Sequence, residues 1–181
     1  MRYQAFISYS HGADARLAPA LQRALHRFAK PWWKARAVDV FRDETSLALA
    51  HSLPDTLTMA LDASEHFILM ASPMAAGSKW VAGECEWWAQ HKNPQKMLVV
   101  LSDGEIAWDE AAGDFDWAKT NAVPPVLKGV FKHEPLYLDL RWTKAAESFS
   151  DRDPRFLDAV ARISAALRRM SLEAIAGEEV R

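Results

Sequence analysis

The sequence predicts a three-layer α/β fold built on an open, doubly wound sheet of five mostly parallel strands. Short apolar segments alternate along the chain with segments whose apolar residues recur at helical spacing. Two of the apolar segments, 66–72 and 96–102, are apolar on both faces, as in parallel strands that helices cover on each side. Such a sheet is flavodoxin-like. The five expected strands are 5–9, 37–41, 66–72, 96–102 and 136–140.

The expected helices lie between these strands. Leu17, Leu21, Leu25 and Phe28 mark the first of them. The others are 53–61 with Ser52 as N-cap and Pro54 in its first turn, 77–91, and a last helix with Asp153 as N-cap and Pro154 in its first turn.

Composition limits the classes of function. The 181 residues suffice for one domain, and a net charge of −2 predicts no basic surface for nucleic acid. A single cysteine, Cys85, allows no internal disulfide and indicates a reducing, cytoplasmic setting. The N-terminal segment lacks a long apolar run, so we expect no signal peptide and no membrane contact within this chain. The stretch 103–117 holds six acidic and no basic residues, which predicts a solvated loop.

Several common sites are missing from the sequence. It contains neither a P-loop motif nor a GxGxxG fingerprint, and no Cys and His cluster has metal-ligand spacing, so no metal and no bound cofactor is expected. A phosphoacceptor receiver domain needs acidic residues after its first strand and at the end of its third. Ser10-His11 and Ala71-Ser72 stand there instead.

Glu84 is the acidic residue with the most unusual neighbours. On a helix, Trp80 and Trp88 lie one turn either side of it and share its face, whereas Glu86 points about 200° away. A carboxyl group between two indoles stands in a partly apolar slot, where burial disfavours its charged form. Glu86 is the ordinary solvated glutamate of the pair. The pattern makes Glu84 the candidate for a functional carboxylate, and the alternative is that it is one more solvated glutamate of the helix.

Three segments in the same order resemble the Toll/interleukin receptor (TIR) domain of the bacterial type. They are AFISYSH at 5–11, VFRDETSL at 40–47, and Ser72-Pro73 followed by SKWVAGE at 78–84. The first and second segments resemble the first and second boxes of the family, and the second leads into its BB loop. The resemblance covers about residues 1–145, which we take as the TIR domain. Residues 146–181 are then a C-terminal helix and a linker. FAKPWW-like and DPRF-like segments occur in bacterial proteins that carry this domain at the N-terminus of a longer chain, and the same is expected here.

The resemblance implies cleavage of NAD+ at the nicotinamide–ribose bond, an NAD+ nucleosidase activity (EC 3.2.2.-). Trp80-x-x-x-Glu84 matches the pattern that carries the catalytic glutamate of NAD-cleaving members. NAD+ would be substrate rather than cofactor, and activity would depend on self-association with other TIR domains in bacterial defence or signalling. The expected substrate-binding residues are Trp80, Ser8, Tyr9, Ser10, His11, Phe41, Arg42 and Asp43. The expected BB-loop and self-association residues are Glu44, Leu47, Leu49, His51 and Ser52.

This chain departs from the family pattern in two places. The BB loop of the family usually has a glycine after its leucine, where Ser52 stands here, and nucleotide-binding members often have arginine where Ser10-His11 follows the first box. Two other functions remain open from the sequence. One is a non-catalytic scaffold that signals through TIR–TIR contacts, and the other is a nucleoside-transferring enzyme with a similar sheet.

Overall fold

The computed structural model describes residues 2–29, 40–42, 53–145 and 149–179. A five-stranded sheet in the order β2-β1-β3-β4-β7 forms its centre, and every neighbouring pair of these strands is parallel. This order is the flavodoxin-like one and confirms the predicted fold class. The strands are β1 (Tyr3–Ser8), β2 (Val40–Arg42), β3 (Ser64–Ala71), β4 (Met97–Leu101) and β7 (Tyr137–Asp139). Of the strand predicted at 37–41, residues 37–39 lie outside the described ranges.

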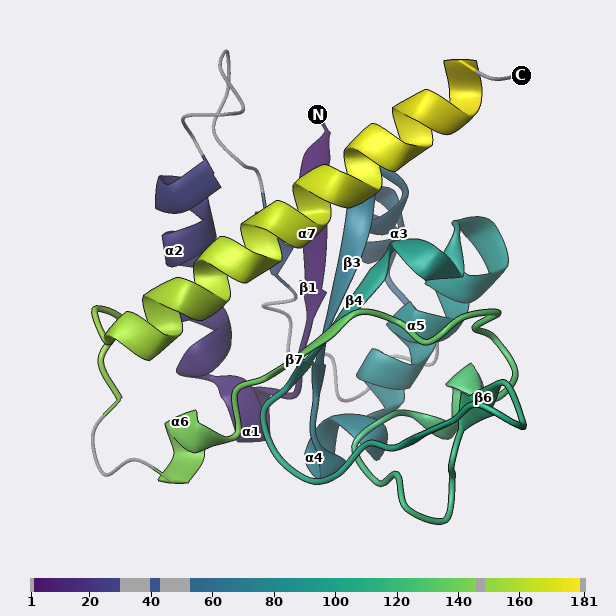
Figure 1. Ribbon diagram of the computed structural model, residues 1–181, viewed down its shortest axis with the longest axis horizontal. Helices are drawn as coiled ribbons and strands as arrows, with labels where there is room; N and C mark the ends of the chain where they lie inside the picture. The colour runs from purple at the N-terminus through teal and green to yellow at the C-terminus, as the bar shows by residue number, and fades with distance from the viewer. Residues whose placement is uncertain (1, 30–39, 43–52, 146–148, 180–181) are drawn as a thin grey trace.

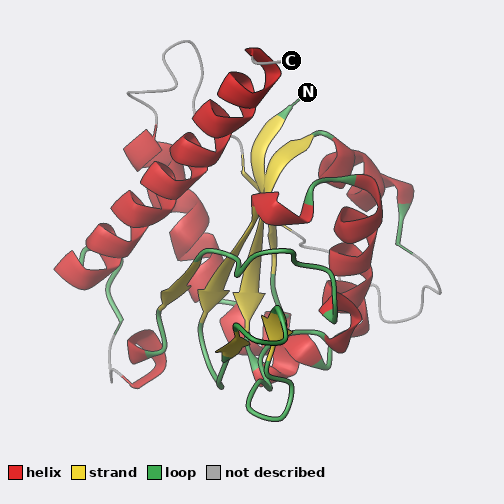
Figure 2. Cartoon of the chain, turned by 45° about the vertical axis from the view of Figure 1, so that its right-hand side comes forward, coloured by secondary structure: helices red, strands yellow, loops and turns green. Residues whose placement is uncertain are grey.

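Helices cover both faces of the sheet, which makes the three layers visible in Figure 2. One face carries α2 (Leu17–Ala29) and α7 (Pro154–Glu179), and the other carries α3 (Asp55–Asp62) and α5 (Lys79–His91). Short elements join these layers: α1 (His11–Asp14), α4 (Pro73–Ala76), α6 (Trp142–Ala145) and the 3-10 turns Pro94–Lys96 and Pro125–Leu127. Within the described ranges, no helix is both long and apolar enough to cross a membrane.

The hydrophobic core is divided by the sheet into two clusters, and strand β3 shows why. Its side chains alternate between the two faces, so Phe67 and Leu69 pack toward α3 and α5, whereas Ile68 and Met70 pack toward α2 and α7. All four side chains are fully buried. A segment that is apolar at every position can satisfy both clusters, which is why this pattern predicted a central strand.

Helix α7 belongs to the same core as the sheet. Its buried residues Phe156, Val160, Ile163 and Leu167 pack against α2 and the strands. Asp153 accepts a hydrogen bond from the Arg155 amide at 2.8 Å, as expected of an N-cap. Figure 1 shows the helix crossing the sheet diagonally, with its C-terminal end projecting past the strands. The domain boundary at residue 145 stays a prediction.

The acidic stretch 103–117 is mostly an exposed or half-buried loop, as its charge predicted, but it also contains a short hairpin. Within it, β5 (Trp108–Asp109) pairs with β6 (Asp114–Phe115) in a short antiparallel ladder. Phe115 is buried, and its ring meets the rings of Trp108 and Trp117 edge-on. The carboxylates of Asp109 and Asp114 accept hydrogen bonds from nearby backbone amides. The acids serve as turn residues around an aromatic cluster, which a count of charges does not detect.

One predicted helix start differs from the structure. Helix α3 begins at Asp55 with Pro54 in the N-cap position, so Pro54 precedes the first turn instead of lying in it. The proposed cap Ser52 lies outside the described residues. The helix predicted at 77–91 is confirmed as α5, which starts at Lys79 behind the N-cap Ser78.

Candidate active site

The candidate residues lie around the carboxyl end of β1. This strand has β2 on one side and β3 on the other, so the order in which successive strands are added to the sheet reverses at β1. Crevices at such a switch point, beyond the carboxyl ends of the strands, are where open α/β sheets bind ligands. The last residue of β1 is Ser8, and Arg42 at the end of β2 is in register with Ile7.

Glu84 meets Ser8 at this end of the sheet. The Ser8 hydroxyl donates a hydrogen bond to Glu84 Oε1 at 2.7 Å, and neither residue has exposed surface. A buried carboxylate is costly unless it is hydrogen-bonded or paired, so this contact is part of what allows Glu84 to occupy its position. The side chain is directed into the protein at the sheet edge, not outward into bulk water.

The local sequence of α5 explains how Glu84 reaches β1. The Ser78 hydroxyl accepts a hydrogen bond from the Val81 amide at 3.3 Å and caps the helix. Val81 and Cys85 flank Glu84 on the buried side of the helix. At Gly83, an added Cβ would lie 3.4 Å from Leu53 Cδ2, so the lack of a side chain there lets Leu53 pack closely against α5. The helix thereby lies close enough to the sheet for a glutamate to touch a strand.

The two indoles on the Glu84 face have different environments. Trp88 is fully buried, stacks at a tilt on Phe67 and donates its Nε1 hydrogen to the Asn93 carbonyl at 3.0 Å. It is a core residue. Trp80 is half-buried, and the Lys79 ammonium lies 6.0 Å from its ring centroid. Only Trp80 of the pair has surface that a ligand can reach.

The remaining residues of the first box follow Ser8. Tyr9 is buried and its ring stacks on the ring of His11 at 4.7 Å, while His11 itself is exposed. Ser10 is buried, and its carbonyl accepts the amide hydrogens of Ala13 and Asp14. Of this group, His11 has the exposed side chain.

The second box is only partly described. Phe41 and Arg42 are backbone positions of β2, beside Phe6 and Ile7. Asp43 and the predicted self-association residues lie outside the described ranges, namely Glu44, Leu47, Leu49, His51 and Ser52. In the described part of the chain, no three His, Cys, Asp or Glu side chains gather as possible metal ligands.

Cys85, next to Glu84, is not poised for nucleophilic chemistry. Its side chain is fully buried, and burial together with the nearby Glu84 charge raises the pKa of the thiol well above its usual range. A thiol in this state carries almost no thiolate at neutral pH.

A second buried carboxylate, Asp14, was missed by sequence reasoning. Asp14 Oδ2 accepts a hydrogen bond from the Ser102 hydroxyl at 3.0 Å, and Oδ1 lies 3.6 Å from Lys144 Nζ. The same ammonium donates to the Ala13 carbonyl at 2.7 Å. Burial raises the pKa of Asp14, against the lowering effect of Ser102 and Lys144. These contacts tie α1 to the end of β4 and to α6. The partners are 88 residues away or more, so no local signal could have revealed them.

Comparison with curated proteins gives a strong match. The chain is 50% identical over 180 residues to the NAD(+) hydrolase ApTIR of Actinoplanes sp.. The alignment covers 99% of this chain but 25% of that protein, so the chain spans about a quarter of the length of its curated relative. No family model matches the chain. Among solved structures, the TIR domains of the activated Roq1 resistosome recognizing the effector XopQ align with a TM-score of 0.44 and 19% identity. That alignment covers 90% of this chain and 84% of theirs.

Proposed function

This chain is a TIR domain, and on that premise we propose that it is an NAD+ glycohydrolase that cleaves the bond between nicotinamide and ribose. The products are nicotinamide and ADP-ribose or its cyclic variant. The observation that carries the proposal is the buried Glu84 carboxylate, held by Ser8 at the carboxyl edge of the sheet. The relative named an NAD(+) hydrolase supports it by its identity along almost the whole of this chain.

The reaction requires one negative charge near the ribose. Nicotinamide leaves as a neutral molecule because its ring nitrogen is cationic in NAD+, so departure needs no strong general acid. Positive charge develops on the ribose instead, and a carboxylate stabilises it while accepting hydrogen bonds from the sugar hydroxyls. We assign this role to Glu84. Preorganised contacts of this kind are worth about 3 to 4 kcal/mol in the transition state.

Ser8 has a second role in our proposal, beside the contact with the adenosine or the phosphates that its position in the first box predicts. Its hydroxyl donates a hydrogen bond to Glu84. A donor to the charged form of a carboxylate favours that form and fixes its orientation. Ser8 therefore acts in our proposal as the residue that positions Glu84.

Other predicted contacts with NAD+ remain part of the proposal. Trp80, half-buried one turn before Glu84, would offer its indole face to the cationic nicotinamide ring. Ser10, His11 and Arg42 would meet the adenosine and the pyrophosphate, and Tyr9 supports His11 through their stacked rings. Phe41 would pack beside the substrate, and we assign Asp43 to bracing of the BB loop.

Activation by self-association fits the burial of Glu84. A carboxylate with no exposed surface contacts a substrate only after a covering group has moved. Assembly of copies, through the predicted BB-loop residues Glu44 to Ser52, would supply that rearrangement, and tethering copies together would raise their effective concentration. We place this assembly in cytoplasmic bacterial defence or signalling, with NAD+ and other TIR domains as partners and with neither nucleic acid nor membrane bound.

Nicotinamide release tests the proposal. The full chain is concentrated with a crowding agent, NAD+ is added, and nicotinamide is followed by chromatography for the wild type, Glu84→Gln and Glu86→Gln. Glu86 is the matched control, because it lies on the same helix but is exposed. We expect Glu84→Gln to lose about 10²- to 10³-fold in rate and Glu86→Gln to stay near the wild type.

Two outcomes would favour the other functions. No turnover by the wild type under any assembling condition contradicts the enzyme and favours a scaffold acting through TIR–TIR contacts. Incorporation of an added free base into the product, with little hydrolysis, favours a nucleoside-transferring enzyme. Equal turnover by Glu84→Gln and the wild type would remove Glu84 from its role.

A further inference from the structure

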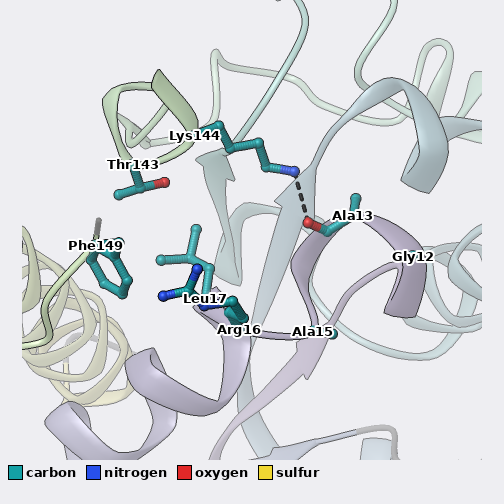
Figure 3. A pocket seen from close by; sticks show the side chains of 8 residues that line it. All are labelled: Gly12, Ala13, Ala15, Arg16, Leu17, Thr143, Lys144 and Phe149. Atoms are coloured by element: carbon teal, nitrogen blue, oxygen red, sulfur yellow. Dashed lines mark hydrogen bonds between the residues drawn. The ribbon is translucent and has the colours of Figure 1, made fainter. Parts of the chain in front are cut away.

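A hollow of about 430 Å³ opens between α1, the start of α2 and α6 (Figure 3). We call it the α1–α6 hollow. Its walls include Arg16, Leu17, Thr143, Lys144 and Phe149. Its volume lies within the range of small-molecule sites. It belongs to the face of the sheet covered by α2 and α7, whereas Glu84 and α5 lie on the opposite face. The α1–α6 hollow therefore lies next to His11 but on the other face of the sheet from Glu84, and its lining contains none of the predicted substrate-binding residues.

The charge of the α1–α6 hollow is positive in a chain whose net charge is −2. Among the described residues that line it, two are cations, Arg16 and Lys144, and none is a carboxylate. Within the described part of the chain, no hydrogen bond or ion pair engages the Arg16 guanidinium. Lys144 donates one ammonium hydrogen to the Ala13 carbonyl and lies 3.6 Å from buried Asp14, which leaves donor capacity on its solvent side. Figure 3 shows Lys144 extending along one side of the hollow and Arg16 lying near Phe149 on another.

The apolar part of the wall suits an aromatic ring. Phe149 is half-buried and is held edge-on by Phe156, with ring centroids 5.0 Å apart. Leu17 beside it is 5% exposed. Aromatic rings stack on such a ring at offset or tilted angles. An aromatic base would pack against Phe149, and an anion would bind between Arg16 and Lys144. A ligand with both groups would match the apolar and the cationic parts of the wall.

We propose that the α1–α6 hollow binds a nucleoside monophosphate, with its base against Phe149 and its phosphate between Arg16 and Lys144. Two N–H groups of the Arg16 guanidinium would donate to two phosphate oxygens, and the Lys144 ammonium would supply a second positive charge. The inference does not depend on NAD+ cleavage, because it uses a different set of residues on the other face of the sheet.

Binding of AMP to the full chain tests this proposal. Isothermal titration compares AMP with adenosine, which keeps the base and removes the phosphate. The variants are Arg16→Gln, in the turn just before α2, and, as a control, Arg27→Gln, an exposed arginine within α2 that does not line the hollow. We expect AMP to bind at least about tenfold tighter than adenosine, and Arg16→Gln to weaken AMP binding by about tenfold or more. Arg27→Gln should bind AMP as the wild type does.

Four results would overturn the proposal: no heat of AMP binding to the wild type at millimolar concentration, equal affinity for AMP and adenosine, unchanged AMP affinity in Arg16→Gln, or equal weakening in both variants. Far-ultraviolet circular dichroism of each variant shows whether it is folded. Phe149→Leu is a second test, because it keeps an apolar wall but removes the aromatic ring. It should weaken the binding of AMP and leave the binding of inorganic phosphate unchanged.

Discussion

Ser8 and Glu84, 76 residues apart in sequence, share a 2.7 Å hydrogen bond in a place from which solvent is excluded. The contact joins the first box of the chain to the tryptophan-rich helix α5. It makes the orientation of the candidate catalytic carboxylate dependent on a hydroxyl in another layer of the fold.

Ser8→Ala should therefore impair the proposed reaction more than it impairs substrate binding. Removing the donor takes one hydrogen bond away from a buried carboxylate, which costs about 1–3 kcal/mol of folding free energy. We expect kcat to fall at least about tenfold with little change in KM, and the acidic limb of the pH–rate profile to move to higher pH, because the charged form loses its donor.

Ser64→Ala is the control for this prediction. Ser64 is also buried, and its hydroxyl donates to the Ala60 carbonyl at 2.7 Å at the opposite end of the sheet. It should lose stability without a change in the pH–rate profile. A profile of Ser8→Ala that superimposes on the wild-type profile would contradict the positioning role.

His66 should make the protein sensitive to acid. Its imidazole is fully buried in β3, Nδ1 lies 3.2 Å from the Gln4 carbonyl, and burial lowers the pKa of His66 to about 4, with repulsion from Lys96 adding to the effect. The unfolded chain takes up this proton near pH 6.5 and the folded chain near pH 4. The free energy of unfolding should thus fall as the pH drops from about 6.5 to about 4, by about 3 kcal/mol in total.

Urea unfolding of the wild type and His66→Gln across this pH range measures the effect. The wild-type midpoint should fall more steeply with decreasing pH than the midpoint of His66→Gln. His133→Gln, at an exposed position, should keep the wild-type slope. Parallel slopes for the wild type and His66→Gln would show that the imidazole does not cause the acid sensitivity.

Lys144→Met should destabilise the protein through Asp14. The ammonium lies 3.6 Å from a carboxylate that is 1% exposed, so its removal leaves a buried negative charge with Ser102 as its remaining hydrogen-bond donor. We expect a loss of about 1–3 kcal/mol at pH 7. Because burial raises the pKa of Asp14, the carboxyl takes up a proton as the pH falls and the loss should shrink.

A double-mutant cycle with Asp14→Asn tests this account. In the Asp14→Asn background, Lys144→Met should cost clearly less than it does alone. Lys119→Met, which removes an exposed partner of Asp116, should change the unfolding free energy by about 0.5 kcal/mol or less. Additive effects of Asp14→Asn and Lys144→Met would refute the coupling.

Gly104→Ala should be one of the more damaging glycine substitutions. Gly104 has φ +80°, and an added Cβ would lie 2.6 Å from Asn121 Oδ1 and 2.8 Å from Pro73 Cδ. Asn121 would have to shift, although its oxygen accepts the Glu105 amide hydrogen at 2.8 Å. We expect a loss of about 2–4 kcal/mol from strain and displaced contacts.

Gly113→Ala separates the two contributions to this loss. Gly113 has φ +65° but nothing within 4 Å of an added Cβ, so it should lose only about 1 kcal/mol for the left-handed backbone. Thermal unfolding of both variants gives the comparison. Equal losses would show that the contacts at Gly104 contribute nothing.

The sequence predicted the features that depend on local pattern. The unbroken apolar run of β3 identified a central strand, and the spacing of Trp80, Glu84 and Trp88 identified the helix face that meets the sheet edge. The spacing did not predict that Trp88 would be buried and Trp80 partly exposed. Whether an indole lies in the core or at the surface depends on neighbours in the fold, such as Phe67 beside Trp88.

The features that the sequence pattern did not predict depend on tertiary contacts. The bond between Ser8 and Glu84 and the cluster around Asp14 join residues from distant parts of the chain, and no spacing rule connects them. The charge of the acidic stretch predicted its exposed loop but not its hairpin, which depends on the burial of Phe115 among other aromatic rings.

Helix α7 is long enough to act as a lever on the sheet. Its 26 residues correspond to a rod of about 39 Å, and Leu167 is the last of its core residues among the side chains that the structure describes. The backbone beyond that residue extends a further 18 Å or so. A rotation of about 10° about the part of the helix up to Leu167 would move its distal end by about 3 Å. A force applied to that end would therefore act on the packing of Phe156 and Val160 against the sheet.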